Sequence, residues 1–103
     1  MSYPTTLADV REAALNYVPN VEGIRDEYAE VIEKATVPSI VGVFRLLSGH
    51  VDALDDDGRL LLCGAAHLIN GHNFSKLRPE ALQVLMSVVP TLPVPSVHSE
   101  NMP

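Results

Sequence analysis

The sequence predicts an all-α fold: a compact array of about five short helices followed by an extended, proline-rich C-terminal tail. Apolar residues recur three and four positions apart along residues 7–89, which is the spacing of one helix face. Proline, asparagine or glycine stands where these patterns stop. Four of the eight prolines then fall within residues 90–103, and proline fixes φ and lacks a backbone donor. We therefore divide the chain into a helical domain, residues 1–89, and a tail, residues 90–103.

The first two helices are separated by Pro19 and Asn20. Thr5 or Thr6 can cap the first helix, and Asn20 can cap the second, because short polar side chains accept from free backbone amides. The expected apolar face of the first helix consists of Leu7, Val10, Ala14 and Tyr17. The expected apolar face of the second consists of Val21, Ile24, Tyr28, Val31, Ile32 and Ala35.

The opposite face of the second helix is acidic. Its charged residues are Glu22, Asp26, Glu27, Glu30 and Glu33, with Arg25 and Lys34 of opposite sign. A face of this kind is usually just solvated. It is also the feature that supports an alternative function, in which Glu27, Glu30 and Glu33 bind a basic groove of another protein.

A third helix is expected after Pro38, which suits a first helical turn. Its apolar stripe, at 4-3-4-3 spacing, consists of Ile40, Phe44, Leu47, Val51 and Leu54. Gly42 and Gly49 each lower helix propensity by about 1 kcal/mol relative to alanine, so we interpret them as positions of close packing. Arg45 is the only formal charge between Lys34 and Asp52. It extends into solvent, pairs with a neighbouring carboxylate or anchors a partner.

The fourth segment begins with three aspartates, Asp55 to Asp57, and is expected to be the central helix. Its apolar residues lie almost all round the helix: Leu60, Leu61, Leu62, Cys63, Ala65, Ala66, Leu68 and Ile69. The aspartates favour a helix start, and Asn70-Gly71 favours a stop. We expect Cys63 and His67, between these ends, to lie in the core. A fifth helix starts near Pro79, and its expected stripe consists of Leu82, Leu85, Met86 and Val89.

No metal site or cofactor is predicted. A calcium loop with Gly58 at its sixth position would need oxygen ligands at its first and twelfth positions, where the sequence has Ala53 and Gly64. Cys63 and His67 are one helical pair. A structural zinc site usually needs two such pairs; His50 or His72 could complete the set, but His72 lies beyond the expected helix stop.

No catalytic constellation is predicted either. Burial would raise the pKa of the Cys63 thiol and make it unreactive. Ser48, His50 and Asp52 are two apart, and residues two apart on a helix do not face each other. The glycines are scattered and form no phosphate-binding loop. We therefore expect a protein that is not an enzyme.

Composition narrows the choice of partners and compartment. The net charge of −6 opposes binding to nucleic acid or to an anionic membrane. No apolar run has the roughly 18–20 residues that span a bilayer, and the first residues do not resemble a signal peptide. We expect a soluble protein, either cytoplasmic or incorporated in a soluble assembly such as a virus particle.

These observations predict a small structural or adaptor subunit that acts by protein–protein contacts, with a protein partner or with copies of itself. The tail is its expected contact arm. The candidate partner-binding residues are Arg45, Pro90, Leu92, Pro93, Val94, Pro95 and Val97. The alternative is an acidic regulator or inhibitor that acts through the second helix.

Overall fold

The structure is a computed structural model, and it describes residues 3–33, 40–71 and 76–92. Its elements are α1 (Leu7–Asn16), α2 (Glu22–Glu33), α3 (Ile40–Ser48), η1 (Val51–Ala53), α4 (Asp56–Gly71), α5 (Arg78–Val88) and η2 (Val89–Thr91), where η marks a 3₁₀ turn. The predicted all-α array of about five short helices is confirmed for these residues, which include no strand. The predictions for Pro38, for His72 and for the tail from Pro93 onward lie outside them.

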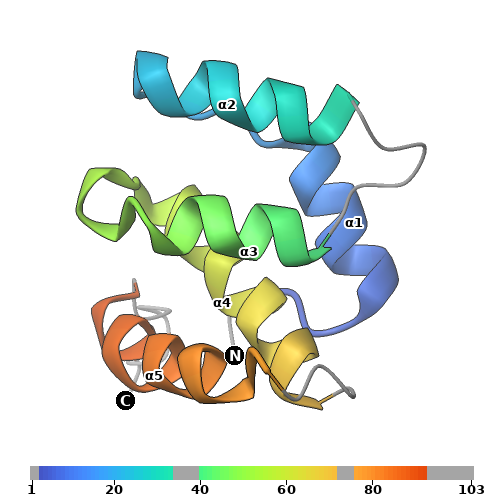
Figure 1. Cartoon of the computed structure of the whole chain (residues 1–103), viewed down its shortest axis with the longest axis vertical. Coiled ribbons are helices and arrows are strands. Elements are labelled where there is room, and N and C mark those ends of the chain that lie inside the picture. The colour runs from blue at the N-terminus through green and yellow to red at the C-terminus, as the bar shows by residue number, and fades with distance from the viewer. Residues whose placement is uncertain (1–2, 34–39, 72–75, 93–103) are drawn as a thin grey trace, which may run out of the picture.

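Helix α4 is the centre of the array. It contacts α1, α3 and α5, while α2 packs against α3 (Figure 1). Helices α2 and α5 lie at opposite ends of the molecule, with α3 between them (Figure 1). The predicted central role of the fourth segment is confirmed, because nine residues of α4 are buried.

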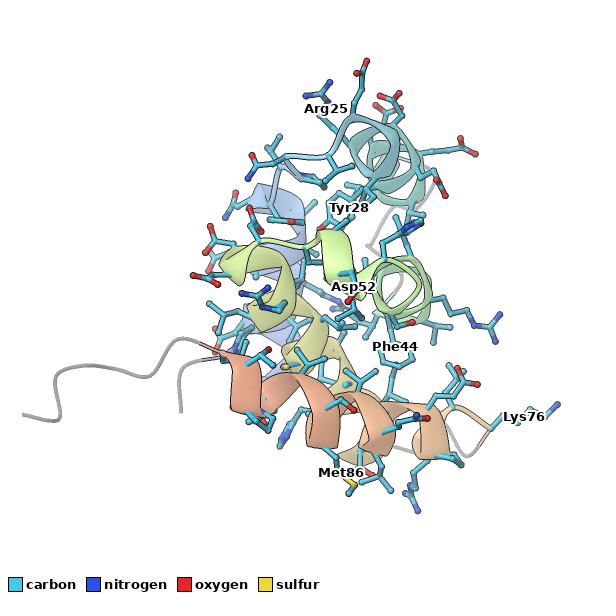
Figure 2. The ribbon with its side chains drawn as sticks, turned by 90° about the vertical axis from the view of Figure 1, so that its left-hand side faces the viewer. Arg25, Tyr28, Phe44, Asp52, Lys76 and Met86 are labelled. Carbon is cyan, nitrogen blue, oxygen red and sulfur yellow. The ribbon has the colours of Figure 1, made fainter. Side chains whose placement is uncertain are left out.

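The core consists mainly of aliphatic side chains, with the aromatic rings of Phe44 and Tyr28 buried among them. Its largest fully buried side chains are Phe44, Leu47, Leu62, Ile69, Val10, Val43 and Cys63. Phe44 extends from α3 toward α5 (Figure 2), and it lines a hollow together with Val84 and Val88 of α5. Phe44 therefore occupies the space between the third and fifth helices.

Two of the predicted caps are confirmed by hydrogen bonds. The Asp9 backbone amide donates to Oγ1 of Thr6 at 3.1 Å. The Gly58 backbone amide donates to Oδ1 of Asp55 at 2.8 Å, so Asp55 caps α4 as expected from the acidic start. Pro79 lies in the first turn of α5, where its missing amide hydrogen leaves no backbone acceptor unpaired.

The third helix is shorter than predicted. It ends at Ser48, and Gly49 and His50 form a turn before the 3₁₀ turn η1. The Gly49 amide donates to the Arg45 carbonyl at 3.2 Å, and the His50 amide donates to the Leu47 carbonyl at 3.1 Å, which closes the helix end. The apolar spacing of the sequence continues past this helix end because η1 brings the chain back to the core. The prediction of one helix through Leu54 is therefore wrong.

Of the two glycines expected at close-packing positions, Gly49 is not one, and two other glycines are. Gly49 is exposed, and a Cβ there would make only ordinary contacts. A Cβ on Gly64 would lie 2.7 Å from the carbonyl oxygen of Pro4, and one on Gly58 would lie 2.5 Å from the Tyr17 hydroxyl oxygen. Both are on α4, so α4 uses glycine where the N-terminal segment and the end of α1 cross it.

We expect Gly64→Ala to lower the free energy of unfolding by about 1–2 kcal/mol, because the added methyl meets the Pro4 backbone. Gly23→Ala on α2 is the matched control. A Cβ at Gly23 meets nothing within 4 Å, so this variant should gain about 0.5–1 kcal/mol from helix propensity. Urea unfolding followed by circular dichroism measures both changes. Stabilisation by both substitutions would contradict the close approach at Gly64.

The buried face of α5 also differs from the prediction. Ala81 and Val88 are buried, whereas Leu82 is 42% exposed and Met86 is 77% exposed. Met86 extends away from the body of the protein (Figure 2). The helix carries two apolar stripes one position apart, and α5 turns the stripe containing the small Ala81 toward the core. Of the predicted stripe, Leu82 and Met86 remain on the surface, whereas Leu85 and Val89 are half-buried and pack against the core.

Helical structure continues past the predicted boundary at residue 89. Val89–Thr91 form η2, and the Leu92 amide donates to the Val89 carbonyl at 3.1 Å. Leu92 is buried and belongs to the core cluster. Pro90 is therefore part of a 3₁₀ turn rather than of an extended chain.

Candidate functional site

The cysteine–histidine pair on α4 is divided between core and surface. Cys63 is fully buried, but His67 is exposed, and its ring packs edge to face on Tyr3 with the ring centroids 6.0 Å apart. The prediction that both lie in the core is wrong for His67, because α4 turns this one position outward. Within the described ranges no three His, Cys, Asp or Glu side chains gather as metal ligands, and His72 lies outside those ranges.

Burial raises the pKa of the Cys63 thiol from its ordinary value of 9.0 to about 11, against the opposing effect of the Arg59 charge. The thiolate is the reactive form of cysteine. At neutral pH this side chain is a protonated, buried apolar group, which is how the sequence analysis interpreted it.

Protein stability should fall as the pH rises from about 9 to about 11. Over this interval the unfolded thiol loses its proton while the folded one keeps it, so ionisation favours the unfolded state. Below pH 9 the thiol is protonated in both states and adds no pH dependence. Urea unfolding at a series of pH values measures the slope. Cys63→Ala should flatten it just above pH 9, and an unchanged slope in that variant would contradict the prediction.

A polar joint connects the end of α1 to the start of α4, and we call it the Asp55 joint. Besides the Gly58 amide, Asp55 accepts from the Tyr17 hydroxyl at 3.0 Å and from Nδ2 of Asn20 at 2.7 Å. The Asn20 side chain, which was expected to cap the second helix, is therefore bound to Asp55. Val21 is the residue that directly precedes α2, and its carbonyl accepts from the Arg25 amide. The joint fixes the α1–α2 connection on the central helix.

Two tyrosines extend this joint to α2. The Tyr28 hydroxyl donates to the carbonyl of Ala14, and the rings of Tyr17 and Tyr28 meet edge to face at 5.4 Å. Burial raises the pKa of both phenols, and the hydrogen bond to Asp55 raises that of Tyr17 further. Both side chains therefore stay neutral and act as structural donors.

Exposed apolar side chains gather around this joint. Leu15 is 59% exposed, Val18 is 68% exposed and Val21 is 39% exposed. Single exposed apolar residues are common on proteins, but Leu15 and Val18 line one hollow together and Val21 follows three positions later. We call these three residues a patch, and exposed apolar patches mark interaction sites. Helix α2, which directly follows Val21, and the exposed Met86 of α5 lie at opposite ends of the molecule (Figure 1, Figure 2).

The patch contains two hollows that share Tyr17 and Val18. One, of about 330 Å³, lies toward α4 and is also lined by Ala13 and Leu60. The other, of about 210 Å³, lies toward α2 and is also lined by Ile32. We call the two together the α1–α2 groove. Its walls are mainly apolar, and it contains no pair of acid and base groups suited to catalysis among the residues that line it.

No family model, curated protein or solved structure matches this chain. No helix in the described part of the chain is both long enough and apolar enough to cross a membrane.

The residues singled out from the sequence lie at separate places. Arg45 is exposed on α3 and makes no ion pair with any residue that the structure describes. Pro90 is exposed in η2, whereas the Leu92 side chain is buried and so is not available at the surface. The remaining tail residues of that set, Pro93, Val94, Pro95 and Val97, lie outside the described residues.

The acidic residues of the alternative function are on one helix. Glu27, Glu30 and Glu33 are all exposed on α2, as the sequence analysis expected. The α1–α2 groove itself was not predicted. The available indication was that Leu15 and Val18 are apolar but lie off the stripe of the first helix, close to Pro19.

Proposed function

We propose that this protein is a small non-enzymatic structural or adaptor subunit that acts through protein–protein contacts within a larger assembly. The observation that carries the proposal is the presence of exposed apolar side chains at two opposite ends of one domain. Val18 lies in the patch at the α1–α2 groove, and Met86 and Leu82 lie on α5. Covering an apolar patch removes its surface from water, which lowers the free energy of the assembly. Two separate patches suit a subunit that connects two neighbours.

The tail is the third contact element of the proposal. Leu92 is buried, so residues 93–103 begin from a fixed point on the helical body. Their sequence is rich in proline and valine, a composition that pairs readily with apolar grooves or sheet edges of partners. Arg45, exposed and without an ion pair to the described residues, is a further candidate anchor.

Proximity labelling in cells that express the protein identifies its neighbouring proteins. The experiment compares four forms: the wild-type chain, Val18→Asp, Met86→Asp and a chain ending at Leu92. Each change should remove a different subset of neighbours. Both aspartate substitutions are at exposed positions, so circular dichroism should show an unchanged fold. A strictly monomeric protein whose neighbours are the same in all four forms would contradict the proposal.

A second candidate function is that of an acidic regulator or inhibitor, and α2 favours it. This helix carries five carboxylates against one arginine, and its acidic residues are exposed. Such a surface complements a basic groove. Lysine substitutions at Glu27, Glu30 and Glu33 should abolish partner binding if this function holds, and should leave it intact if contacts through the apolar patches dominate.

A further inference from the structure

We propose that the α1–α2 groove binds a linear segment of a partner protein that combines bulky apolar side chains with flanking lysine or arginine. This inference rests on the proposed function and specifies the chemistry of one partner. Three observations support it: the paired hollows, the exposed side chains on their edges and the charge that surrounds them.

The dimensions of the groove suit a peptide segment. The two hollows, of about 330 and 210 Å³, meet at Tyr17 and Val18, so they form two adjoining depressions rather than one deep cavity. A small-molecule site normally encloses its ligand, whereas peptide-binding grooves offer neighbouring apolar pockets to successive anchor side chains. Leu15 and Val18, both more than half exposed, provide the edges that such anchors would cover.

The floor of the groove is fixed before any partner binds. The Tyr17 hydroxyl is held by Asp55, and the Tyr17 ring packs on Tyr28, which donates in turn to the Ala14 carbonyl. A surface that is already ordered loses little conformational entropy on binding. The connection between α1 and α2 is therefore already ordered. The free energy gained by covering the apolar walls does not have to offset the entropic cost of ordering it.

The charge around the groove selects a basic partner. Asp57 lines the first hollow and Glu33 the second. Beyond these, the start of α4 has Asp55 and Asp56 in addition to Asp57. Among the residues that the structure describes here, the cations are Arg25, which lines the second hollow and extends outward from α2 (Figure 2), and Arg59, which is paired with Asp56. Carboxylates outnumber cations here, so lysine or arginine flanking an apolar anchor gains favourable electrostatics.

The same charge opposes the other occupants. A second copy of this chain also has a net charge of −6 and would bring carboxylates against carboxylates. The chain's own residues 93–103 include Glu100 and no lysine or arginine, so they lack the cations that the rim favours.

The test is a selection from a phage-displayed library of random linear peptides on the immobilised full-length chain, followed by affinity measurements on the synthesised peptides. Enriched peptides should combine leucine, isoleucine or phenylalanine with lysine or arginine. Val18→Asp should weaken their binding at least about tenfold. Combined Glu33→Lys and Asp57→Lys substitutions should weaken it about fivefold at low salt and less at high salt. Met86→Asp, the matched control on the far side, should leave it unchanged.

Three results of the peptide experiment would overturn the inference: enrichment of acidic peptides, equal binding to Val18→Asp, or binding that Met86→Asp removes. The last would place the contact on α5, and the proposed adaptor function would stand without this groove. Dimerisation of the free chain that Val18→Asp abolishes would identify a second copy as the occupant. Amide resonances of residues 93–103 that move in Val18→Asp would identify the tail. Either result would also overturn it.

Discussion

Phe44→Ala is expected to lower the free energy of unfolding by about 3–5 kcal/mol, the largest effect of any single substitution we consider. Phe44 is fully buried and fills the space between α3 and α5. Alanine would leave a cavity that two helices held by other contacts cannot close, so the lost contacts would add to the lost transfer free energy. Small domains are stable by about 5–15 kcal/mol, and this change would remove a large share of that.

Urea unfolding followed by circular dichroism measures the loss, with Met86→Ala as control. Met86 is 77% exposed on the outer stripe of α5, so its truncation should change stability by less than about 0.5 kcal/mol. If the two substitutions had similar effects, the orientation of α5 described above would be wrong. The comparison therefore tests which stripe of α5 faces the core as well as the importance of Phe44.

The elements of the fold that could be predicted from the sequence are those whose signals are local. Thr6 and Asp55 act on amides only three residues away, so their identity and position were enough to predict two helix starts. The central place of α4 followed from apolar residues all round it, since such a helix has no face suited to water. Neither prediction required knowledge of what lies next to the helix.

The predictions that failed required tertiary information. On α5, Leu82 and Met86 form as regular a stripe as Ala81 and Val88 do, and only packing on α4 decides between them. At Gly49 the helix ends, but the apolar spacing of the sequence continues because the 3₁₀ turn η1 brings the next apolar residues back to the core. Spacing alone cannot distinguish these cases, and the orientation of α5 leaves Leu82 and Met86 exposed.

The candidate site was hidden for a similar reason. Asp55 and Asn20 are 35 positions apart, and no local rule connects a helix cap to a loop amide at that distance. The joint that they form is what places Val18 at the surface between two hollows. The sequence did predict the other half of the site, because the exposed carboxylates of α2 follow from its helical period.

Asp55→Ala is the second large prediction, with an expected loss of about 2–3 kcal/mol. The substitution removes the cap of α4 and leaves the hydroxyl of Tyr17 without its acceptor. Loss of a cap costs about 0.5–2 kcal/mol, and hydrogen bonds to a charged group contribute about 1.5–3 kcal/mol. Asp56→Ala is the matched control. Asp56 is exposed and pairs only with Arg59 among the described residues, so its loss should cost less than about 1 kcal/mol.

A double-mutant cycle with Tyr17→Phe separates the cap from the joint. If Tyr17 and Asp55 act together, the loss in the double variant should be smaller than the sum of the single losses by about 1 kcal/mol. Amide exchange in residues 16–21 should accelerate in Asp55→Ala more than in Asp56→Ala, because only Asp55 fixes this connection to α4. Additive losses with unchanged exchange would mean that Asp55 only caps α4, and the fixed floor attributed to the α1–α2 groove would then depend on the contact between Tyr17 and Tyr28 alone.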